Sequence, residues 1–175
     1  MNSLWEAIEQ GNARPRPFMP PDVSATAPAT AMIFFDTNIF VYAFLATEAR
    51  KRETAINLVE ANLGSGQGCV SYQVIQEFAN VARKKFAVRM TADDCKAFID
   101  AALQPMNRVA SSTDLIHAAL DLQDELRYSF YDSLVIAAAL QAGAHTLYSE
   151  DLQHWQLVRG LLRIVNPFQE VTHEI

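Results

Sequence analysis

The chain has 175 residues, a length typical of one domain, and half of them are hydrophobic, which is enough for one substantial core. Its apolar runs, such as residues 134–140, fall well short of the roughly 18–20 residues that span a bilayer, which excludes an integral membrane protein. The net charge of −6 argues against nucleic-acid binding through total charge. Half of the 14 lysine and arginine residues nevertheless lie within 50–52 and 83–89, so either a local basic patch or two solvated helix faces fit the sequence.

The two cysteines, Cys69 and Cys95, have neither the spacing of a metal site nor that of a disulfide framework. The four histidines likewise show no ligand spacing. No basic region followed by an apolar stretch begins the chain, so we expect no signal peptide. These features favour a cytoplasmic protein that does not associate with membranes.

Residues 1–31 differ in composition from the rest because they hold five of the seven prolines. We expect an extended N-terminal arm here, with a short helix from Ser3 to Gln10, and a folded domain over residues 32–175. Because the first expected strand begins at Met32, the arm should be dispensable for the fold.

Beyond Met32, continuous apolar runs alternate with segments of helical periodicity. The run Met32–Phe35 is typical of a strand buried on both faces, and the spacing of Val74, Phe78 and Phe86 indicates a helix. Strands are expected at 32–35, 68–70, 107–110, 145–148 and 162–165, and helices at 39–45, 48–63, 72–86, 91–103, 112–126 and 130–141. Strands separated by helices predict an α/β fold, a three-layer sandwich with a central parallel sheet flanked by helices. In such sheets functional groups collect at the carboxyl ends of the strands.

Two acids follow expected strands directly. Asp36 is the first polar residue after the run Met32–Phe35, and Asp151 comes just past the strand 145–148. Each also has a structural alternative, since Asp36 can cap the next helix and Asp151 can be an ordinary loop acid.

Two further acids lie on expected helices. Glu77 borders the apolar stripe formed by Val74 and Val81, either as a functional acid or as a boundary carboxylate reaching water. Asp132 opens an almost wholly apolar helix, and its spacing from Ser129 also fits a capping box.

All four acids point to one edge of the predicted sheet. Clustered carboxylates repel one another near an apolar core, and a divalent cation removes that penalty. Oxygen ligands favour Mg²⁺ or Mn²⁺, and no histidine or cysteine constellation indicates zinc.

Four segments in this order resemble the PIN domain, and within it the VapC-type ribonuclease toxins. They are Met32-Ile-Phe-Phe-Asp36-Thr-Asn38, Gln73-Val-Ile-Gln-Glu77-Phe, Tyr131-Asp132-Ser133-Leu-Val-Ile-Ala-Ala-Ala and Leu147-Tyr-Ser149-Glu-Asp151-Leu. The resemblance covers about residues 32–168. It implies a PIN-like, Rossmann-like sheet, Mg²⁺- or Mn²⁺-dependent cleavage of RNA, homodimerisation and inhibition by a paired antitoxin.

The resemblance also implies roles for individual residues. Asp36, Asp132 and Asp151 would hold the metal, while Glu77 would hold a second ion or orient the attacking water. Three polar residues would orient these acids or contact the phosphate: Asn38, Ser133 and Ser149. The basic residues on the helix of Glu77 would bind the RNA backbone: Arg83, Lys84 and Lys85.

Two alternatives remain open at this point. A haloacid-dehalogenase-type phosphatase also places an aspartate after its first strand, but it needs a second aspartate two residues on, where this chain has Asn38. A non-catalytic binding module of the same fold is the other alternative, because fold does not fix function.

Overall fold

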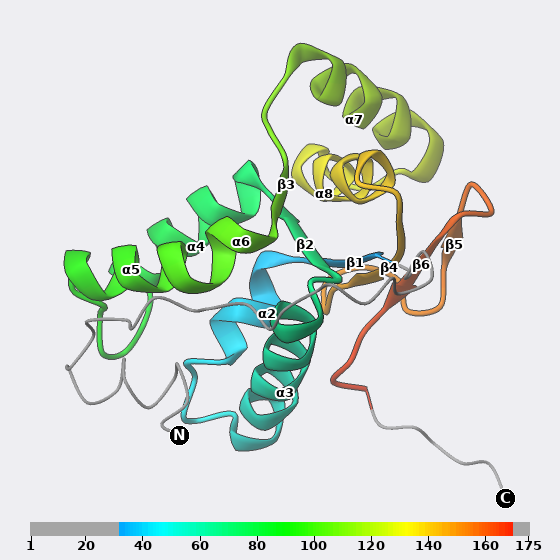
Figure 1. The fold of residues 1–175 in the computed structure, drawn as a ribbon. Helices are drawn as coiled ribbons and strands as arrows, with labels where there is room; N and C mark the ends of the chain where they lie inside the picture. The colour runs from blue at the N-terminus through cyan, green and yellow to red at the C-terminus, as the bar shows by residue number, and fades with distance from the viewer. Residues whose placement is uncertain (1–31, 170–175) are drawn as a thin grey trace, which may run out of the picture.

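A six-stranded sheet runs through the part of the chain that the computed structural model describes, residues 32–169 (Figure 1). The expected arm over residues 1–31 lies outside this range. The strands are β1 (Met32–Phe35), β2 (Gly68–Ser71), β3 (Asn107–Val109), β4 (Ala144–Tyr148), β5 (Leu157–Val158) and β6 (Leu162–Val165). Their order is β3-β2-β1-β4-β6-β5, and every neighbouring pair is parallel except the antiparallel pair of β5 and β6.

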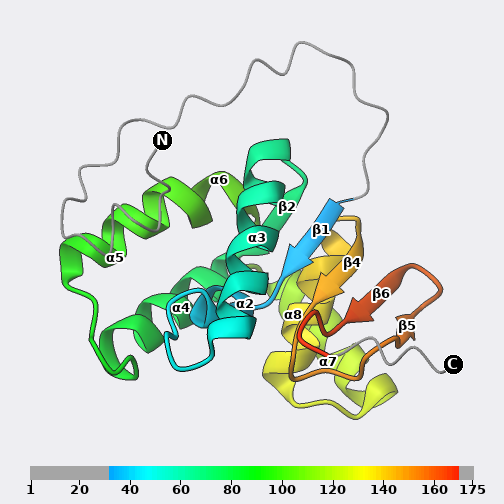
Figure 2. The ribbon, with the colours of Figure 1, turned by 90° about the horizontal axis from the view of Figure 1, so that it is seen from below.

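Helices cover both faces of this sheet, which confirms the α/β prediction. They are α2 (Thr37–Tyr42), α3 (Ala49–Ser65), α4 (Tyr72–Lys84), α5 (Ala92–Phe98), a π-helical segment η1 (Ile99–Leu103), α6 (Gln104–Met106), α7 (Thr113–Leu126) and α8 (Phe130–Gln141). Helices α7 and α8 lie on one face, and α3, with α2 beside it, lies on the other (Figures 1 and 2). No helix among the described residues is long and apolar enough to cross a membrane.

The helices begin where short polar side chains cap them. Ser71 and Ser112 accept hydrogen bonds from the backbone N–H groups three residues on, Val74 and Leu115, at the starts of α4 and α7. Thr91 caps α5 in the same way. These caps explain why the expected starts of α4, α5 and α7 agree with the structure to within a residue.

Three elements differ from the sequence-based expectation. The first helix starts at Thr37 rather than Ile39, because Asp36 caps it. The helix expected over 91–103 continues to Met106 through the π-helical turn. Strand β5 was not expected, since two residues are too few to carry a periodic pattern.

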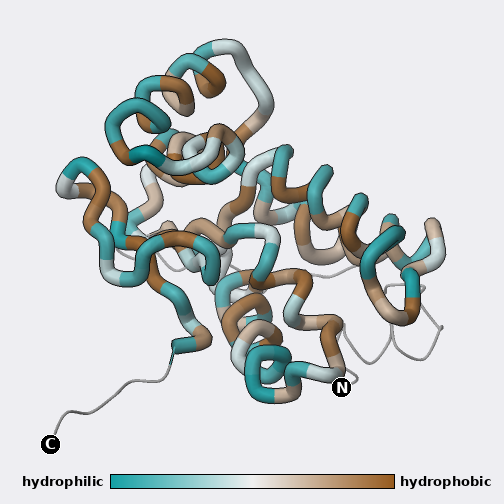
Figure 3. Tube along the Cα trace, turned by 180° about the vertical axis from the view of Figure 1, so that it is seen from behind, coloured by the Kyte–Doolittle hydropathy of each residue, from teal (hydrophilic) through white to brown (hydrophobic). Residues whose placement is uncertain are grey.

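A cluster of phenylalanines packs α2, α4 and α5 together. Phe78 on α4 lies 4.8 Å from Phe98 on α5, measured between ring centroids, and Phe44 just after α2 lies 5.0 Å from Phe98. Phe40 also contacts Phe98, so a single ring joins all three helices. Figure 3 shows the corresponding alternation of hydrophobic and hydrophilic residues along the helices. This packing holds α4, which carries Glu77, against α2.

Candidate active site

The strand order reverses between β1 and β4. From β1 the chain moves to β2 on one side, whereas β4 pairs with the other side of β1. The carboxyl ends of two such strands leave a crevice that no crossover helix covers. Phe35 pairs with Tyr148 at this end, so the residues that follow, Asp36 and Ser149, emerge side by side.

Asp36 is the centre of the polar contacts at this end of the sheet. Its Oδ1 accepts a hydrogen bond from the Thr37 N–H at 2.7 Å, and its Oδ2 accepts one from the Ser149 hydroxyl at 2.7 Å. Burial above all, together with the charges of Glu77 and Asp151, raises the pKa of the Asp36 carboxyl to about 6, against the lowering effect of these two hydrogen bonds. Asp36 therefore caps α2 and also belongs to a group of acids.

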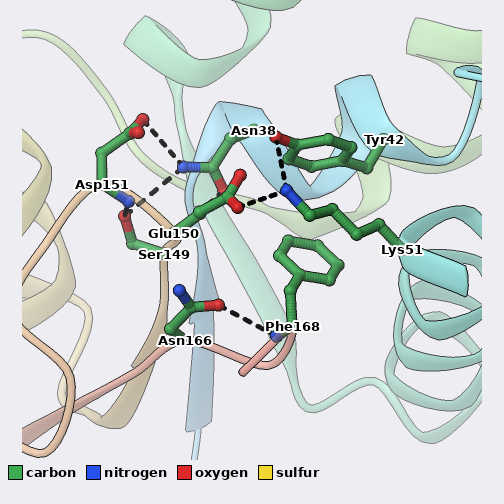
Figure 4. Close-up of polar contacts among 8 residues, drawn as sticks. All are labelled: Asn38, Tyr42, Lys51, Ser149, Glu150, Asp151, Asn166 and Phe168. Carbon is green, nitrogen blue, oxygen red and sulfur yellow. Dashed lines mark hydrogen bonds and ion pairs between the residues drawn. The ribbon is translucent and has the colours of Figure 1, made fainter. Parts of the chain in front are cut away.

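Asn38 connects Asp36 to Asp151. Its side-chain Nδ2 donates to Asp36 Oδ2 and to Asp151 Oδ2, both at 3.1 Å. Figure 4 shows this amide facing Asp151 and Ser149. The Asp151 N–H in turn donates to the Ser149 hydroxyl oxygen at 3.3 Å, so one turn of chain presents both side chains.

Glu77 reaches the same place from α4. This helix follows β2, the neighbour of β1, and its Ser71 cap sets the helix at the carboxyl edge of the sheet. The Thr37 hydroxyl donates to Glu77 Oε2 at 2.7 Å, and the Gln73 amide donates to Oε1 at 2.7 Å. Both carboxylate oxygens are thus held by donors.

Asp132 stands somewhat apart from the other three acids. It lies in the first turn of α8, where its Oδ2 accepts from the Ser129 hydroxyl at 2.6 Å and its N–H donates to the same oxygen of Ser129. Among the described residues no hydrogen bond joins it to the other three acids. The adjacent Ser133 is fully buried, and its hydroxyl has no hydrogen-bond partner in residues 32–169. The capping interaction considered from the sequence is therefore present.

The donor set fits a hard cation, although the side chains are not arranged around one. Within residues 32–169 no three acidic, histidine or cysteine side chains are spaced to hold a metal as they stand. The charges of Glu77 and Asp151 nevertheless act on Asp36, and the Asn38 amide occupies the space between two of these carboxylates. Carboxylate oxygens are the ligands that Mg²⁺ and Mn²⁺ favour, and a bound cation would remove the repulsion that raises the pKa of Asp36.

The basic residues of α4 extend away from Glu77 along the same helix. Arg83, Lys84 and Lys85 are exposed, and Arg83 also donates to the Met90 carbonyl oxygen at 3.1 Å. Lys84 lies seven residues after Glu77, so it projects from the same side of the helix about 10 Å further on.

Sequence reasoning missed several residues around the acids. The spacing of Gln73 and Glu77, one helical turn apart, was a usable signal for their hydrogen bond. Lys51 carries no such signal, because its neighbours Arg50 and Arg52 indicate only a basic cluster. The structure instead pairs Lys51 with Glu150, with Nζ and Oε1 2.5 Å apart.

The fold and the site define a class: a parallel α/β domain with acids at the point where the strand order reverses. The chain belongs to the PIN domain family, whose model matches residues 33–159. This membership excludes the phosphatase alternative, in agreement with Asn38 in place of a second aspartate.

Three solved structures are similar to this chain. A toxin-antitoxin complex from Klebsiella pneumoniae has a TM-score of 0.58 and 20% identity, covering 81% of this chain and 100% of that chain. VapBC2 from Rickettsia felis, bound to a DNA fragment from its promoter, has a TM-score of 0.55 and 18% identity, covering 77% and 99%. VapC20 from Mycobacterium tuberculosis, a sarcin-ricin loop cleaving toxin, has a TM-score of 0.49 and 23% identity, covering 67% and 88%. No curated protein sequence matches the chain.

Proposed function

We propose that this chain is a metal-dependent endoribonuclease, the toxin of a type II toxin-antitoxin pair. The observation that carries the proposal is the Asp36 carboxyl, whose pKa burial raises to about 6 at the switch point of a PIN domain. Perturbed acids in such a crevice are typical of active sites. The membership of the family, rather than the acids alone, selects nucleic acid as substrate.

Asp36, Asp151 and Asp132 are the proposed ligands of Mg²⁺ or Mn²⁺. The bound metal would supply an activated water and neutralise charge on the phosphate. For Asp36 and Asp151 to turn to a cation, the Asn38 amide must leave its place between them. Asp132 must likewise exchange its hydrogen bond from Ser129 for the metal.

The remaining polar residues orient these acids and handle the proton. Ser149 and the Thr37 N–H fix the Asp36 carboxylate by hydrogen bonds. Glu77, held by Thr37 and Gln73, is positioned to accept a proton from the attacking water or to hold a second ion. Asn38, once its amide has left the two acids, is the proposed phosphate contact. Ser133 is fully buried, so its proposed role is to orient the neighbouring Asp132 rather than to contact the phosphate.

The basic end of α4 is the proposed RNA-binding surface. Lys84 lies on the Glu77 side of this helix, and Lys85 and Arg83 flank it. A strand whose phosphate reaches the acids would therefore pass these cations, which bind the backbone without reading sequence.

The double variant Lys84→Glu/Lys85→Glu is expected to weaken RNA binding and to flatten its dependence on salt by about two units of logarithmic slope. Metal affinity should change little. Both quantities can be measured by titrating a labelled RNA at several salt concentrations and by calorimetry with Mn²⁺. An unaltered salt slope would mean that these lysines are only a solvated helix face.

Two protein partners belong to the proposal. Two of the similar structures are toxin-antitoxin complexes, which supports a paired antitoxin as a partner of this chain. We also propose a homodimer, for which exposed apolar side chains on adjoining helices offer a surface: Tyr72, Ile116, Leu120 and Tyr131. Light scattering of the purified chain measures its molar mass and so shows whether it is a dimer.

The test of the proposed activity is to sequence the RNA 5′ ends that appear when the chain is induced in cells. We expect new, discrete ends with the native chain and none with Asp132→Asn. Asp114→Asn is the matched control, because it neutralises an exposed acid in the first turn of α7. If Asp132→Asn produces the same ends as the native chain, Asp132 is not part of the site.

A non-catalytic PIN-fold module is the competing proposal. A module without catalytic function is expected to show no cation binding at these acids. Calorimetric titration of the chain with Mn²⁺ separates the two proposals, since the nuclease requires binding that Asp36→Asn removes.

A further inference from the structure

A partly buried lysine on α3, Lys51, lies near the acids, and the proposed function gives it no role. The Lys51 Nζ lies 2.5 Å from Glu150 Oε1 and 3.1 Å from the Tyr42 hydroxyl (Figure 4). It also lies 4.5 Å from the centroid of the Tyr42 ring and 5.8 Å from that of Phe168. Only 29% of the Lys51 side chain and 24% of the Glu150 side chain are exposed, so this ion pair is partly withdrawn from water.

The aromatic walls around Lys51 are themselves fixed. Tyr42 and Phe168 pack edge to face, with 4.8 Å between ring centroids. The Phe168 N–H donates to the Asn166 side chain, and the Asn166 N–H donates to His154 Nδ1. The end of α2, the start of α3 and residues 166–168 therefore form one bracket around the ammonium group.

Glu150 connects this bracket to the acids. It stands between Ser149, which donates to Asp36, and Asp151, which accepts from Asn38. The Glu150 N–H donates to Asn38 Oδ1 at 3.4 Å, while its carboxylate accepts from Lys51 Nζ. The turn 149–151 is thus held through its backbone by Asn38 and through the Glu150 side chain by Lys51.

We propose that Lys51 is a positioning residue: through Glu150 it fixes the turn 149–151 and so sets the place of Asp151 relative to Asp36. The inference rests on the proposed function, in which these two acids bind the metal. Lys51 touches neither acid, and it acts only through the backbone of the turn. Its ion pair with Glu150 also keeps the Glu150 carboxylate away from the acid cluster.

Simple electrostatics makes the opposite prediction, which gives the test its power. Removing a positive charge near the acids should strengthen cation binding if Lys51 acts only through space. Removing a positioning residue should weaken it, because Asp151 is no longer held where the cation needs it. The sign of the change therefore separates the two roles.

The experiment compares Lys51→Met with the native full-length chain by calorimetric titration with Mn²⁺ and by amide hydrogen exchange of residues 148–152. We expect Mn²⁺ affinity to fall about tenfold, the lower end of the range for groups that orient metal ligands. Amide exchange in the turn should become faster, and RNA cleavage should recover as Mn²⁺ is raised. Lys51→Arg, which keeps the charge, should retain both native values.

Two further variants complete the design. Lys96→Met is the matched control, since it also removes one positive charge, from an exposed pair with Asp93 on α5. Lys96→Met should change neither the Mn²⁺ affinity nor the amide exchange of residues 148–152. Glu150→Gln should weaken Mn²⁺ binding as Lys51→Met does, and the double variant should bind no more weakly than either single one, because both break the same connection.

Three results would overturn the proposal. The first is that Lys51→Met binds Mn²⁺ at least as tightly as the native chain, and the second is that it binds Mn²⁺ more weakly while amide exchange of residues 148–152 is unchanged. The third is that the fold-losses in Mn²⁺ affinity of Lys51→Met and Glu150→Gln multiply in the double variant. If the native chain binds no Mn²⁺, the metal-dependent function fails separately, and the exchange of residues 148–152 alone decides whether Lys51 holds the turn.

Discussion

Replacing Asp36 by asparagine is expected to lower the rate of RNA cleavage by about a thousandfold or more. A metal contributes several kcal/mol to transition-state stabilisation, and each 1.4 kcal/mol is a factor of ten in rate. The asparagine side chain keeps one oxygen that can accept from the Thr37 N–H, so α2 should remain capped. The measurement is single-turnover cleavage of a labelled RNA, with Asp114→Asn as the control for loss of one acidic charge.

The same substitution should raise the stability of the metal-free chain, with a definite pH dependence. The pKa of Asp36 in the folded chain is about 6, above its usual 3.8, because burial and two neighbouring acids disfavour the charged carboxylate. Between these pH values the folded chain holds a proton that the unfolded chain has released, so native stability falls as pH rises from about 4 to about 6. Asparagine has no proton to release, and it escapes this loss.

Thermal unfolding in EDTA checks this directly. Above pH 6 the Asp36→Asn variant should melt at a higher temperature than the native chain. The corresponding gain in the free energy of unfolding is at most about 3 kcal/mol. The difference should shrink towards pH 4. A variant that is less stable at pH 7.5, or a difference that does not depend on pH, would show that the Asp36 carboxylate is not destabilised by its surroundings.

Removal of divalent cations is expected to abolish cleavage completely, and Mg²⁺ or Mn²⁺ should restore it, with Zn²⁺ a poor substitute. The acids supply only oxygen ligands, which are a poor match for zinc. Metal should also stabilise the folded chain, by about 2.7 kcal/mol at a concentration one hundred times the Kd, because only the folded chain brings the acids together.

The measurements are RNA cleavage and melting temperature after dialysis against EDTA and after return of each ion. Asp36→Asn provides the control, since its melting temperature should not respond to Mn²⁺. Undiminished cleavage in excess chelator would refute metal dependence while leaving the fold and family of the chain unaffected.

The sequence could predict the acids that follow strands more readily than the contacts between them. Asp36 and Asp151 were found because a buried strand followed by a polar residue marks the carboxyl edge of a parallel sheet. The family resemblance predicted that Asn38 orients the acids, but its bridge between Asp36 and Asp151 could not be predicted, since the bond to Asp151 depends on how β1 and β4 align across more than a hundred residues. Lys51 was misread for the same reason: nothing near it in the sequence indicates its partner, Glu150.

Asp132 shows a different limit. Its spacing from Ser129 fitted both a capping box and a functional acid, and the structure contains the cap. A carboxylate in the first turn of a helix can complete a capping box or bind a metal, so the local sequence cannot distinguish these two roles for Asp132. Only the Asp132→Asn experiment decides the functional role.

The hydrogen bond between Ser149 and Asp36 joins residues 113 positions apart. During synthesis on the ribosome, β1 leaves the exit tunnel long before β4 exists, so early folding intermediates contain Asp36 without Ser149 and Asp151. The acids meet only after β4 has paired with β1, one of the most distant contacts in the sheet and therefore slow to form. A growing chain therefore lacks the assembled acid cluster until β4 has folded, and under the proposed function fragments that end before β4 are expected to cleave no RNA.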